Sequence, residues 1–249
     1  MVGLEKYKSK SRLAGLASEI WGQENLYCPN CDSPHIQETP TNTPAIDYEC
    51  PRCRALFQLK AKASAFAGRI VDAGYSKMIR AIKENRTPNI FALHYDPTSW
   101  TVANIFLVPH FAYSLSAIEK RKPLGPLARR AGWVGCNILL HAIPPDARIA
   151  IVRAGKPAPP AEVRREYARL KPLATLDAKR RGWTLDVLNG IHSLGKKGFN
   201  LEDAYTLEAH LSRLHPANRN VQPKIRQQLQ VLRDLGLLEF LGKGSYRLR

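Results

Sequence analysis

The sequence predicts a mixed α/β or α+β domain over residues 1–181 and a small domain of three helices and a β-hairpin over residues 182–249. A chain of 249 residues is long enough to bury one or two hydrophobic cores. In the first part, β-rich apolar runs alternate with segments of helical periodicity. In the last part, three helical patterns lead into two short strands, so the two parts have different predicted architectures.

The first domain begins with a predicted helix over residues 9–24, because Leu13, Leu16, Ile20 and Trp21 fall on one side of it. The segments that read as strands are residues 45–48, 55–60, 89–95, 102–108 and 148–152. The segments that read as later helices are residues 75–84 and 162–170. Strands interleaved with helices favour an α/β or α+β domain.

The second domain follows a charged stretch over residues 171–182, bounded by Pro172 and Gly182, which we expect to be a connector. Its three predicted helices are residues 185–194, 201–214 and 221–235. Residues 237–248 then read as a hairpin with a basic tip at Lys243. Three helices and such a hairpin are typical of a winged helix.

The positive charge of the chain is concentrated in its middle. The formal net charge is 38 − 21 = +17, and it divides into 13 − 11 = +2 over residues 1–119, 15 − 4 = +11 over residues 120–181, and 10 − 6 = +4 over residues 182–249. The basic runs are Lys120-Arg121-Lys122, Arg129-Arg130, Arg164-Arg165 and Lys179-Arg180-Arg181. Such clusters favour a polyanion partner, usually nucleic acid, over a merely solvated surface. Pro and Gly break the runs, which disfavours an anionic membrane surface.

Membrane insertion and secretion have no support in the sequence. No stretch approaches about 18 consecutive apolar residues, the length that a membrane-spanning helix needs. The N-terminus becomes charged at Glu5 and Lys6, which is unlike a secretory signal. We therefore expect a soluble, cytoplasmic protein, and the sequence leaves its oligomeric state open, with a monomer the simplest expectation.

Four of the five cysteines form two Cys-x-x-Cys pairs, Cys28 with Cys31 and Cys50 with Cys53, and 18 residues lie between the pairs. This spacing is typical of a zinc ribbon, in which four thiolates surround one structural Zn²⁺. A disulfide framework and a thioredoxin-like redox pair are the weaker alternatives. Cys136 has no such partner and is expected to be a small buried hydrophobic residue.

The last predicted helix has one apolar and one polar side. Ile225, Leu229 and Leu232 recur at i, i+4 and i+7, which predicts the buried stripe. The polar residues on or near the other side are Lys224, Arg226, Gln227, Gln230 and Arg233. Since Gln can bridge an adenine edge and Arg a guanine edge, this side and the hairpin residue Lys243 are candidates for reading DNA. An ordinary polar helix face and a protein-binding surface are the alternatives.

Asp47, Gln58 and Lys60 are the candidate reaction centre. Gln58 and Lys60 would share one face of their strand, because side chains alternate with period two. Metal-dependent nucleases use such a set: Asp47 and Gln58 would hold Mg²⁺ against the scissile phosphate, and Lys60 would help to orient or deprotonate water. An Asp followed by a strand with (Glu or Gln)-x-Lys is the PD-(D/E)xK pattern. The trio also occurs by chance, and Lys60 with Lys62 would also suit a solvated edge.

Long runs of the chain resemble a known enzyme family. These runs are Tyr27–Cys31, Asp47-Tyr48, Leu59-Lys60, Asp72–Tyr75, Arg121–Leu124, Ala128–Trp133 and Lys224–Asp234. On them, and along almost its whole length, the chain resembles the DpnI-like type II, methyl-directed restriction endonucleases. The resemblance implies a PD-(D/E)xK domain with a four-cysteine zinc ribbon and a C-terminal winged helix, both reading double-stranded DNA with N6-methyladenine. It implies Mg²⁺-dependent phosphodiester hydrolysis at methylated GATC sites, the activity of a type II site-specific deoxyribonuclease.

The resemblance also implies roles for single residues. Asp47 matches the metal carboxylate, Gln58 the second metal position and Lys60 the catalytic lysine. The four paired cysteines match the zinc ligands. Trp133, which follows the basic pair Arg129-Arg130, matches a tryptophan that approaches the DNA at the methylated base. The alternative for Trp133 is an ordinary core residue.

One position departs from the family, which has Glu where this chain has Gln58. An amide keeps an oxygen ligand but removes a charge, so Mg²⁺ should bind more weakly. A natural Gln-x-Lys variant and an engineered substitution that blocks cleavage both fit, and a non-cleaving methylated-DNA-binding protein is the alternative function. Glu19 or Glu24 of the first helix is a further candidate for the metal site.

Overall fold

A computed structural model describes residues 9–40, 43 and 45–249, and the chain divides into two compact units. The described residues up to Ala67 form the first unit together with Pro88–His110 and Arg148–Ala168. The second unit consists of Gly68–Thr87, Phe111–Ala147 and Arg169–Arg249. Each unit is therefore assembled from separate stretches of the sequence.

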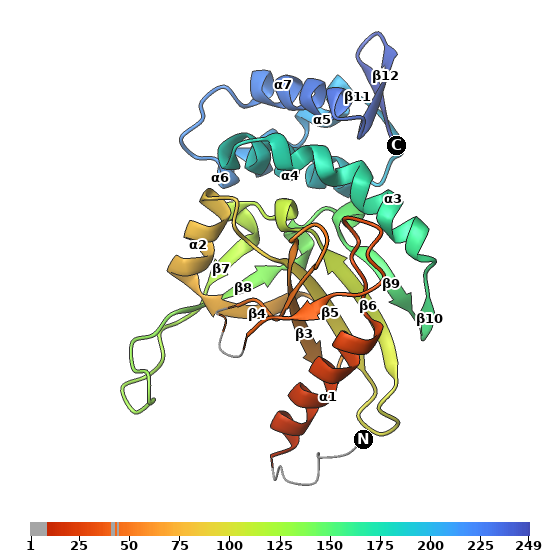
Figure 1. Cartoon of the computed structure of the whole chain (residues 1–249). Helices are drawn as coiled ribbons and strands as arrows, with labels where there is room; N and C mark the ends of the chain where they lie inside the picture. Colours follow the sequence, from red (N-terminus) through yellow and green to blue (C-terminus); the bar gives the residue numbers. More distant parts are fainter. Residues whose placement is uncertain (1–8, 41–42, 44) are drawn as a thin grey trace. The chain divides into compact units, whose positions relative to one another are not determined.

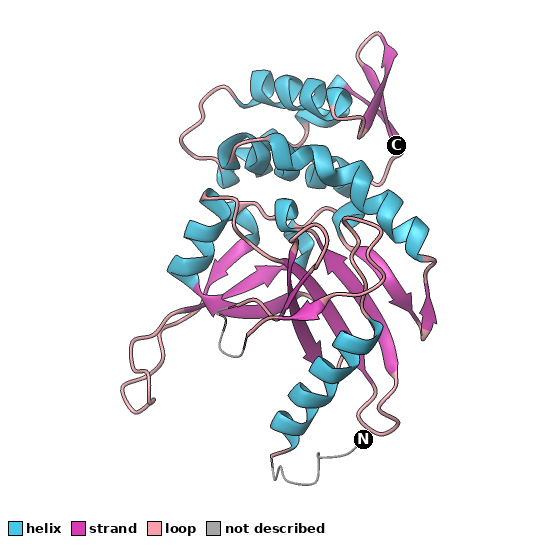
Figure 2. Cartoon of the chain, viewed as in Figure 1, coloured by secondary structure: helices cyan, strands magenta, loops and turns pink. Residues whose placement is uncertain are grey.

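A seven-stranded sheet in the order β1-β2-β3-β5-β6-β9-β10 forms the first unit (Figure 2). Its strands are β1 (Gln37–Glu38), β2 (Tyr48–Glu49), β3 (Leu56–Lys62), β5 (Asn89–Tyr95), β6 (Val102–Val108), β9 (Ile149–Arg153) and β10 (Lys156–Pro157). Only the β3–β5 pair is parallel among these described strands, and the other neighbours are antiparallel. The strands expected at 89–95 and 102–108 are confirmed at their predicted bounds.

Two helices belong to this sheet unit, α1 (Lys10–Asn25) and α3 (Pro160–Leu170), although the last two residues of α3 fall in the second unit. The α1 helix packs closely against the sheet through Gly22, where an added Cβ would lie 2.5 Å from the Tyr48 hydroxyl oxygen. That hydroxyl donates a hydrogen bond of 2.8 Å to the backbone oxygen of Glu19. The close approach of Gly22 thus brings the backbone of Glu19 to the side chain of Tyr48 on β2.

A three-stranded antiparallel sheet in the order β4-β8-β7 forms one part of the second unit. Its strands are β4 (Arg69–Gly74), β7 (Ile118–Lys120) and β8 (Gly135–Leu139), and α2 (Tyr75–Lys83) follows β4 directly. Cys136 on β8 is fully buried and its thiol contacts the Ala73 oxygen at 3.3 Å, as expected for a small core residue. The short helical turns among the described residues are η2 (His110–Ala112), η3 (Leu115–Ala117), η4 (Leu140–Ala142), η5 (Pro145–Ala147) and η6 (Lys171–Thr175).

The other part of the second unit contains the C-terminal helices and a second three-stranded sheet, in the order β11-β13-β12 (Figure 1). The helices are α4 (Ala178–Ser193), α5 (Leu201–Tyr205), α6 (Glu208–Leu214) and α7 (Val221–Asp234). The strands are β11 (Gly198–Asn200), β12 (Leu238–Gly242) and β13 (Ser245–Leu248). Ile225, Leu229 and Leu232 of α7 are completely buried, which confirms the predicted apolar stripe.

Two expectations about this region are wrong. The stretch 171–182 is not a connector, because α4 begins at Ala178, where the Asp177 side chain accepts hydrogen bonds from the N–H groups of Lys179 and Arg180. The helix expected over 201–214 is two helices, since the chain turns between Tyr205 and Glu208. None of the described helices has the length and apolar character needed to cross a membrane.

Candidate functional site

The four paired cysteines converge on one point in the first unit. Their Sγ atoms all lie within 4.8 Å of one another, with 3.6 Å between Cys28 and Cys53 and 3.5 Å between Cys31 and Cys50. A tetrahedral Zn²⁺ with Zn–S bonds of about 2.3 Å separates its sulfur ligands by about 3.8 Å. The cluster therefore has the donor set and the spacing of a structural zinc site.

The four cysteines differ in how their surroundings treat the thiolate, because burial raises the pKa of Cys28 and Cys31 while the backbone favours the thiolate of Cys50. Burial acts to raise the pKa of Cys50, but the N–H groups of Cys53 and Arg52 stabilise its thiolate and lower the pKa to about 7. Asn30 also donates a hydrogen bond of 3.3 Å to the Cys53 sulfur. A divalent cation would offset this cost of burial, because it stabilises the thiolate form of its cysteine ligands.

Arg164 of α3 holds the backbone around the first Cys-x-x-Cys pair, Cys28 and Cys31. Its guanidinium donates hydrogen bonds to the backbone oxygens of Cys28 at 3.1 Å and Ser33 at 3.0 Å. It also lies 5.3 Å from the Tyr27 ring. Arg164 therefore has a structural role, which corrects its assignment to the basic runs expected to meet a polyanion.

Arg181 corrects the same expectation in the second unit. It is 1% exposed, and its guanidinium donates hydrogen bonds to Ile82 O at 3.1 Å, Leu176 O at 3.2 Å and Asn85 Oδ1 at 3.0 Å. Burial lowers its pKa, and Asp177 acts in the opposite direction. Arg181 therefore supports the junction of α2 and α4 instead of contributing to a basic surface.

Asp47 lies where the pairing of β2 with β3 ends. Its N–H group donates to the Phe57 oxygen at 2.9 Å, and its carboxylate accepts the Leu59 N–H at 2.7 Å. Leu59 stands between Gln58 and Lys60 on β3. The carboxylate is therefore held beside the part of the strand that carries the other two candidate residues.

Gln58 and Lys60 occupy alternate positions of one regular strand. Their Cα partners on β5 are Ile90 and Ala92, so no bulge intervenes and both side chains leave the same face of the sheet. Gln58 is 7% exposed, and its Oε1 atom has no hydrogen-bond partner among the residues that the structure describes. A buried oxygen that accepts no hydrogen bond is rare and destabilises the fold, and a bound cation or an ordered water would remove that penalty.

Glu19 adds an acidic group to this region. Its pKa is raised by partial burial and then by the negative charges of Asp47 and Glu38. Glu24, the other candidate on α1, is exposed. Glu19 therefore lies within reach of the Asp47 charge, and two neighbouring carboxyl groups are a donor set that fits a hard divalent cation such as Mg²⁺.

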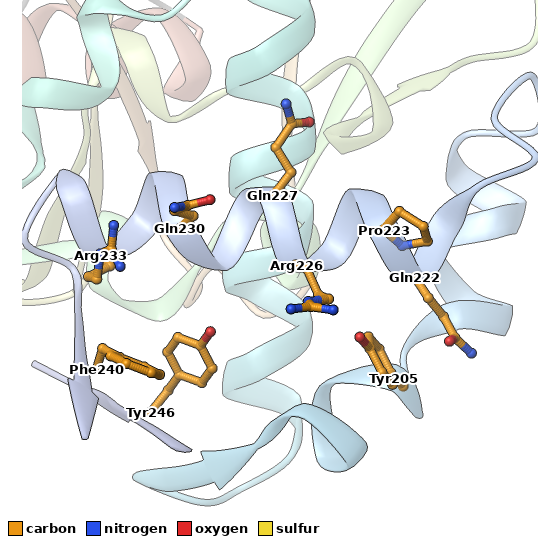
Figure 3. Close-up of a pocket in the computed structure, with 9 residues that line it drawn as sticks. All are labelled: Tyr205, Gln222, Pro223, Arg226, Gln227, Gln230, Arg233, Phe240 and Tyr246. Carbon is orange, nitrogen blue, oxygen red and sulfur yellow. The ribbon is translucent and has the colours of Figure 1, made fainter. Parts of the chain in front are cut away.

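In the second unit, a cavity of about 560 Å³ lies along the exposed side of α7 (Figure 3). It is lined by Tyr205, Gln222, Pro223, Arg226, Gln227, Gln230, Arg233, Phe240 and Tyr246. Figure 3 shows Arg226 leaving α7 toward the rings of Tyr205 and Tyr246. Four of the five polar residues expected on this helix therefore line one cavity: Arg226, Gln227, Gln230 and Arg233.

The aromatic wall of this cavity was not foreseen from the sequence. Phe240 is 45% exposed on β12, and its ring lies 5.2 Å from that of Tyr246 on β13. The Tyr246 ring in turn stacks on Phe199 at 5.6 Å. Period two gave no signal for this, because it places Phe240 on the same face of β12 as Leu238, which is buried.

Lys224 is turned toward the protein. Its ammonium donates to Gln227 Oε1 at 2.7 Å and lies 5.9 Å from the Trp183 ring. Burial lowers its pKa, and the nearby positive charges of Lys179 and Arg180 act in the same direction. These three cations form a local positive field beside the first residues of α7.

Lys243 stands at the tip of the β12–β13 hairpin, as expected. The loop consists of Lys243 (φ 48°) and Gly244 (φ 73°), between the paired residues Gly242 and Ser245. Positive φ at both central positions is the geometry of a tight type I′ turn. The turn leaves the Lys243 side chain exposed.

The indole ring of Trp133 packs against two glycines of the β4-β8-β7 sheet, Gly74 and Gly135. A Cβ built on Gly135 would come within 2.8 Å of the indole ring, and one built on Gly74 would lie 3.6 Å from its Nε1 atom. The Arg130 guanidinium lies 4.7 Å from the ring centre, and Arg129 is exposed. Trp133 is half-buried, so one part of its surface remains accessible.

Two family models match the chain. The DpnI model, described as the Dam-replacing family, matches residues 3–176. The model of the DpnI C-terminal region, described as the Dam-replacing HTH domain, matches residues 179–248. The second match covers α4 to β13, which contain the cavity along α7.

Proposed function

The chain belongs to the DpnI, or Dam-replacing, family, and we propose that it cleaves double-stranded DNA at GATC sites that carry N6-methyladenine. The family supports a restriction nuclease with a DNA-binding helix–turn–helix domain. The observation that carries the catalytic part of the proposal is the carboxylate of Asp47, held at the strand between Gln58 and Lys60.

We assign residues 1–181 to a PD-(D/E)xK catalytic domain with its four-cysteine zinc ribbon, and residues 182–249 to a winged helix that reads DNA. The four cysteines supply all the ligands that a tetrahedral Zn²⁺ accepts, which supports a structural and not a catalytic zinc. Both parts contribute to recognition of the methylated site in this proposal.

Asp47 and Gln58 are the residues that would hold Mg²⁺. The carboxyl group of Glu19 interacts with the Asp47 charge, and its own negative charge would further favour a cation there. A bound Mg²⁺ would supply Lewis-acid stabilisation of charge on the scissile phosphate. Lys60 orients the attacking water and offsets the negative charge that develops on the phosphorus oxygens. Attack by water on phosphorus breaks one phosphorus–oxygen bond and leaves a phosphate on one end and a hydroxyl on the other.

Recognition begins at the cavity along α7. Gln230 and Arg233 can meet base edges, since Gln matches adenine and Arg matches guanine in the major groove. Phe240 and Tyr246 offer apolar surface to a methyl group, and burying one methyl-sized group contributes about 0.8 kcal/mol. Two methyl groups and two reading sites, the second at Trp133, would multiply that discrimination.

Plasmid cleavage tests the proposal. The protein is incubated in Mg²⁺ with three substrates: GATC-methylated DNA, the same DNA without methylation, and the same DNA with its GATC sites removed. Cutting confined to the methylated GATC plasmid is the expected result. Equal cutting of the methylated and unmethylated plasmids would refute methyl-directed cleavage.

A second function is favoured by one observation, the amide at position 58. A protein that binds methylated DNA without cutting it would retain the cavity along α7 while lacking the charge needed to hold Mg²⁺. Binding of the methylated duplex without cleavage, followed by cleavage after Gln58→Glu, would identify a disabled enzyme of this kind.

A further inference from the structure

The segment between β7 and β8, residues 121–134, forms an extended loop that we call the basic arm. In Figure 1 it runs out from the ends of these two strands. With Lys120 at its base, it carries five basic residues and no acidic one. The basic residues are Lys120, Arg121, Lys122, Arg129 and Arg130.

Backbone hydrogen bonds shape the arm, although it has no core of its own. The Leu124 N–H donates to Trp133 O, and the Gly132 N–H donates to Leu124 O, both at 2.9 Å. The two bonds close a short loop over residues 125–131. A third bond, from the Trp133 N–H to Arg130 O at 3.1 Å, forms a turn in which Gly132 has a φ of 76°.

The outer end of the arm is a second turn, Gly125–Ala128, closed by a 3.0 Å hydrogen bond from the Ala128 N–H to Gly125 O. Pro126 occupies the second position, where its fixed φ favours the turn. Leu127 occupies the third position and is 101% exposed. The turn therefore presents a leucine side chain that contacts nothing in the chain around it.

The setting of Leu127 distinguishes it from other exposed hydrophobic residues. Within the described part of the chain, six other large apolar side chains are 41–55% exposed, so each keeps about half of its surface against the protein. Isolated exposed apolar residues are common and need no explanation. A fully exposed leucine at the outermost turn of a cationic loop combines apolar surface with attraction to polyanions, which is the chemistry of proteins that wedge DNA base steps apart.

We propose that Leu127 is an apolar wedge that enters the stacked bases of duplex DNA while Arg129 and Arg130 hold the flanking phosphates. This inference rests on the proposed function, since it assumes that DNA is the partner of the second unit. A lipid surface fits less well, because one leucine side chain anchors a protein weakly to a bilayer, whereas the proposed function already brings DNA to this chain. Unstacking by Leu127 would open a base step of the methylated site to the protein.

The test uses the full chain in Ca²⁺ without Mg²⁺ and a set of methylated GATC duplexes. Each duplex carries 2-aminopurine at one position within or beside the site, because this base becomes fluorescent when it is unstacked. Leu127→Ala removes the wedge, Leu127→Met keeps an apolar side chain, and Leu115→Ala is the matched control at an apolar residue that is 41% exposed. Affinity for the unlabelled duplex is measured for every variant.

The parent, Leu127→Met and Leu115→Ala proteins should unstack one labelled position equally. Leu127→Ala should lose that signal and bind roughly 10-fold more weakly, as expected for one leucine returned to water. Unchanged fluorescence and affinity in Leu127→Ala, while the parent binds methylated DNA, would overturn the wedge and leave the proposed function intact. Failure of the parent itself to bind methylated duplex would overturn both.

A second arm of the experiment separates DNA from lipid. The parent and Leu127→Ala proteins are sedimented with phosphatidylserine–phosphatidylcholine vesicles. Equal and weak binding supports the wedge. Strong vesicle binding that depends on Leu127 would overturn it in favour of a membrane contact.

Discussion

The Asp47 carboxylate accepts the Leu59 N–H at 2.7 Å, and this contact joins the end of β2 to the strand that carries Gln58 and Lys60. The bond forms at the point where the β2–β3 ladder stops, so the carboxylate replaces the next ladder partner. A structural task and the proposed catalytic task therefore fall on the same side chain.

Asp47→Asn is expected to abolish cleavage, because an amide removes the charge that holds Mg²⁺. Since an Asn oxygen can still accept the Leu59 N–H, the loss of stability should be small, about 1–2 kcal/mol. Urea unfolding and cleavage of methylated plasmid measure the two effects. Asp47→Ala should be less stable than Asp47→Asn, and loss of methylated-DNA binding in the Asn variant would contradict a purely catalytic role.

Removing zinc is expected to unfold the ribbon formed by Cys28, Cys31, Cys50 and Cys53. Four ligands confine the cation, and binding free energies of such sites are about 10–16 kcal/mol. Zinc release on adding a chelator, followed with a colorimetric dye, should coincide with a fall in Tm. Cys50→Ser should contain less than one equivalent of zinc. Cys136→Ala is the matched control and should retain it, and zinc content independent of Cys50 would contradict the assignment.

Arg226→Ala and Gln230→Ala should each weaken binding of the methylated duplex, by about 1–3 kcal/mol if the side chain contacts a base. Both residues line the cavity along α7, whereas Arg213 of α6 is exposed to solvent and is not part of the cavity lining. Arg213→Ala therefore serves as the charge-matched control in fluorescence anisotropy titrations. Equal weakening by Arg213→Ala and Arg226→Ala would indicate a general charge effect and no specific contact.

The pH dependence of stability should include a contribution from Asp146. Burial alone would raise its pKa, but the hydrogen bond and charge of His192, together with Arg169, lower it below the ordinary value of 3.8. A carboxyl with a lowered folded-state pKa stabilises the fold above its unfolded-state pKa and loses that contribution as the pH falls through the folded value. Asp146→Asn should therefore be less stable than the parent at pH 6, with the difference shrinking below about pH 4.

Denaturant titrations of the parent and Asp146→Asn proteins at several pH values measure this contribution. Asp177 offers no equivalent control, because its carboxylate caps the N-terminus of α4. A difference in stability that stays constant from about pH 6 to about pH 3 would show that the ion pair with His192 contributes nothing.

Regular amphipathic patterns predicted the elements that they cover. The apolar runs of β5 and β6 and the i, i+4, i+7 stripe of α7 are properties of the local sequence, so their bounds were foreseen closely. The cysteine cluster was also predicted, because the two Cys-x-x-Cys pairs and the spacing between them can be read directly from the sequence.

Other features depend on partners far away in the chain. The strands β4, β7 and β8 lack a strong pattern and exist through pairing with one another, as Arg69↔Leu139 and Ile118↔Ile138 show. A run of basic residues does not reveal which member turns inward, so the burial of Arg181 was missed. The α1 carboxylate near Asp47 was only one of two candidates, because the choice between Glu19 and Glu24 depends on how the helix packs at Gly22.

Single-turnover cleavage of a methylated GATC duplex by the parent and Gln58→Glu proteins tests the central claim most directly. A second carboxylate at position 58 should strengthen Mg²⁺ binding, so Gln58→Glu should cut at lower Mg²⁺ concentration and faster than the parent. Asp47→Asn in the Gln58→Glu background should return the rate to background. A Gln58→Glu protein that binds the methylated duplex at saturating Mg²⁺ but leaves it uncut would contradict a reaction centre at Asp47, residue 58 and Lys60.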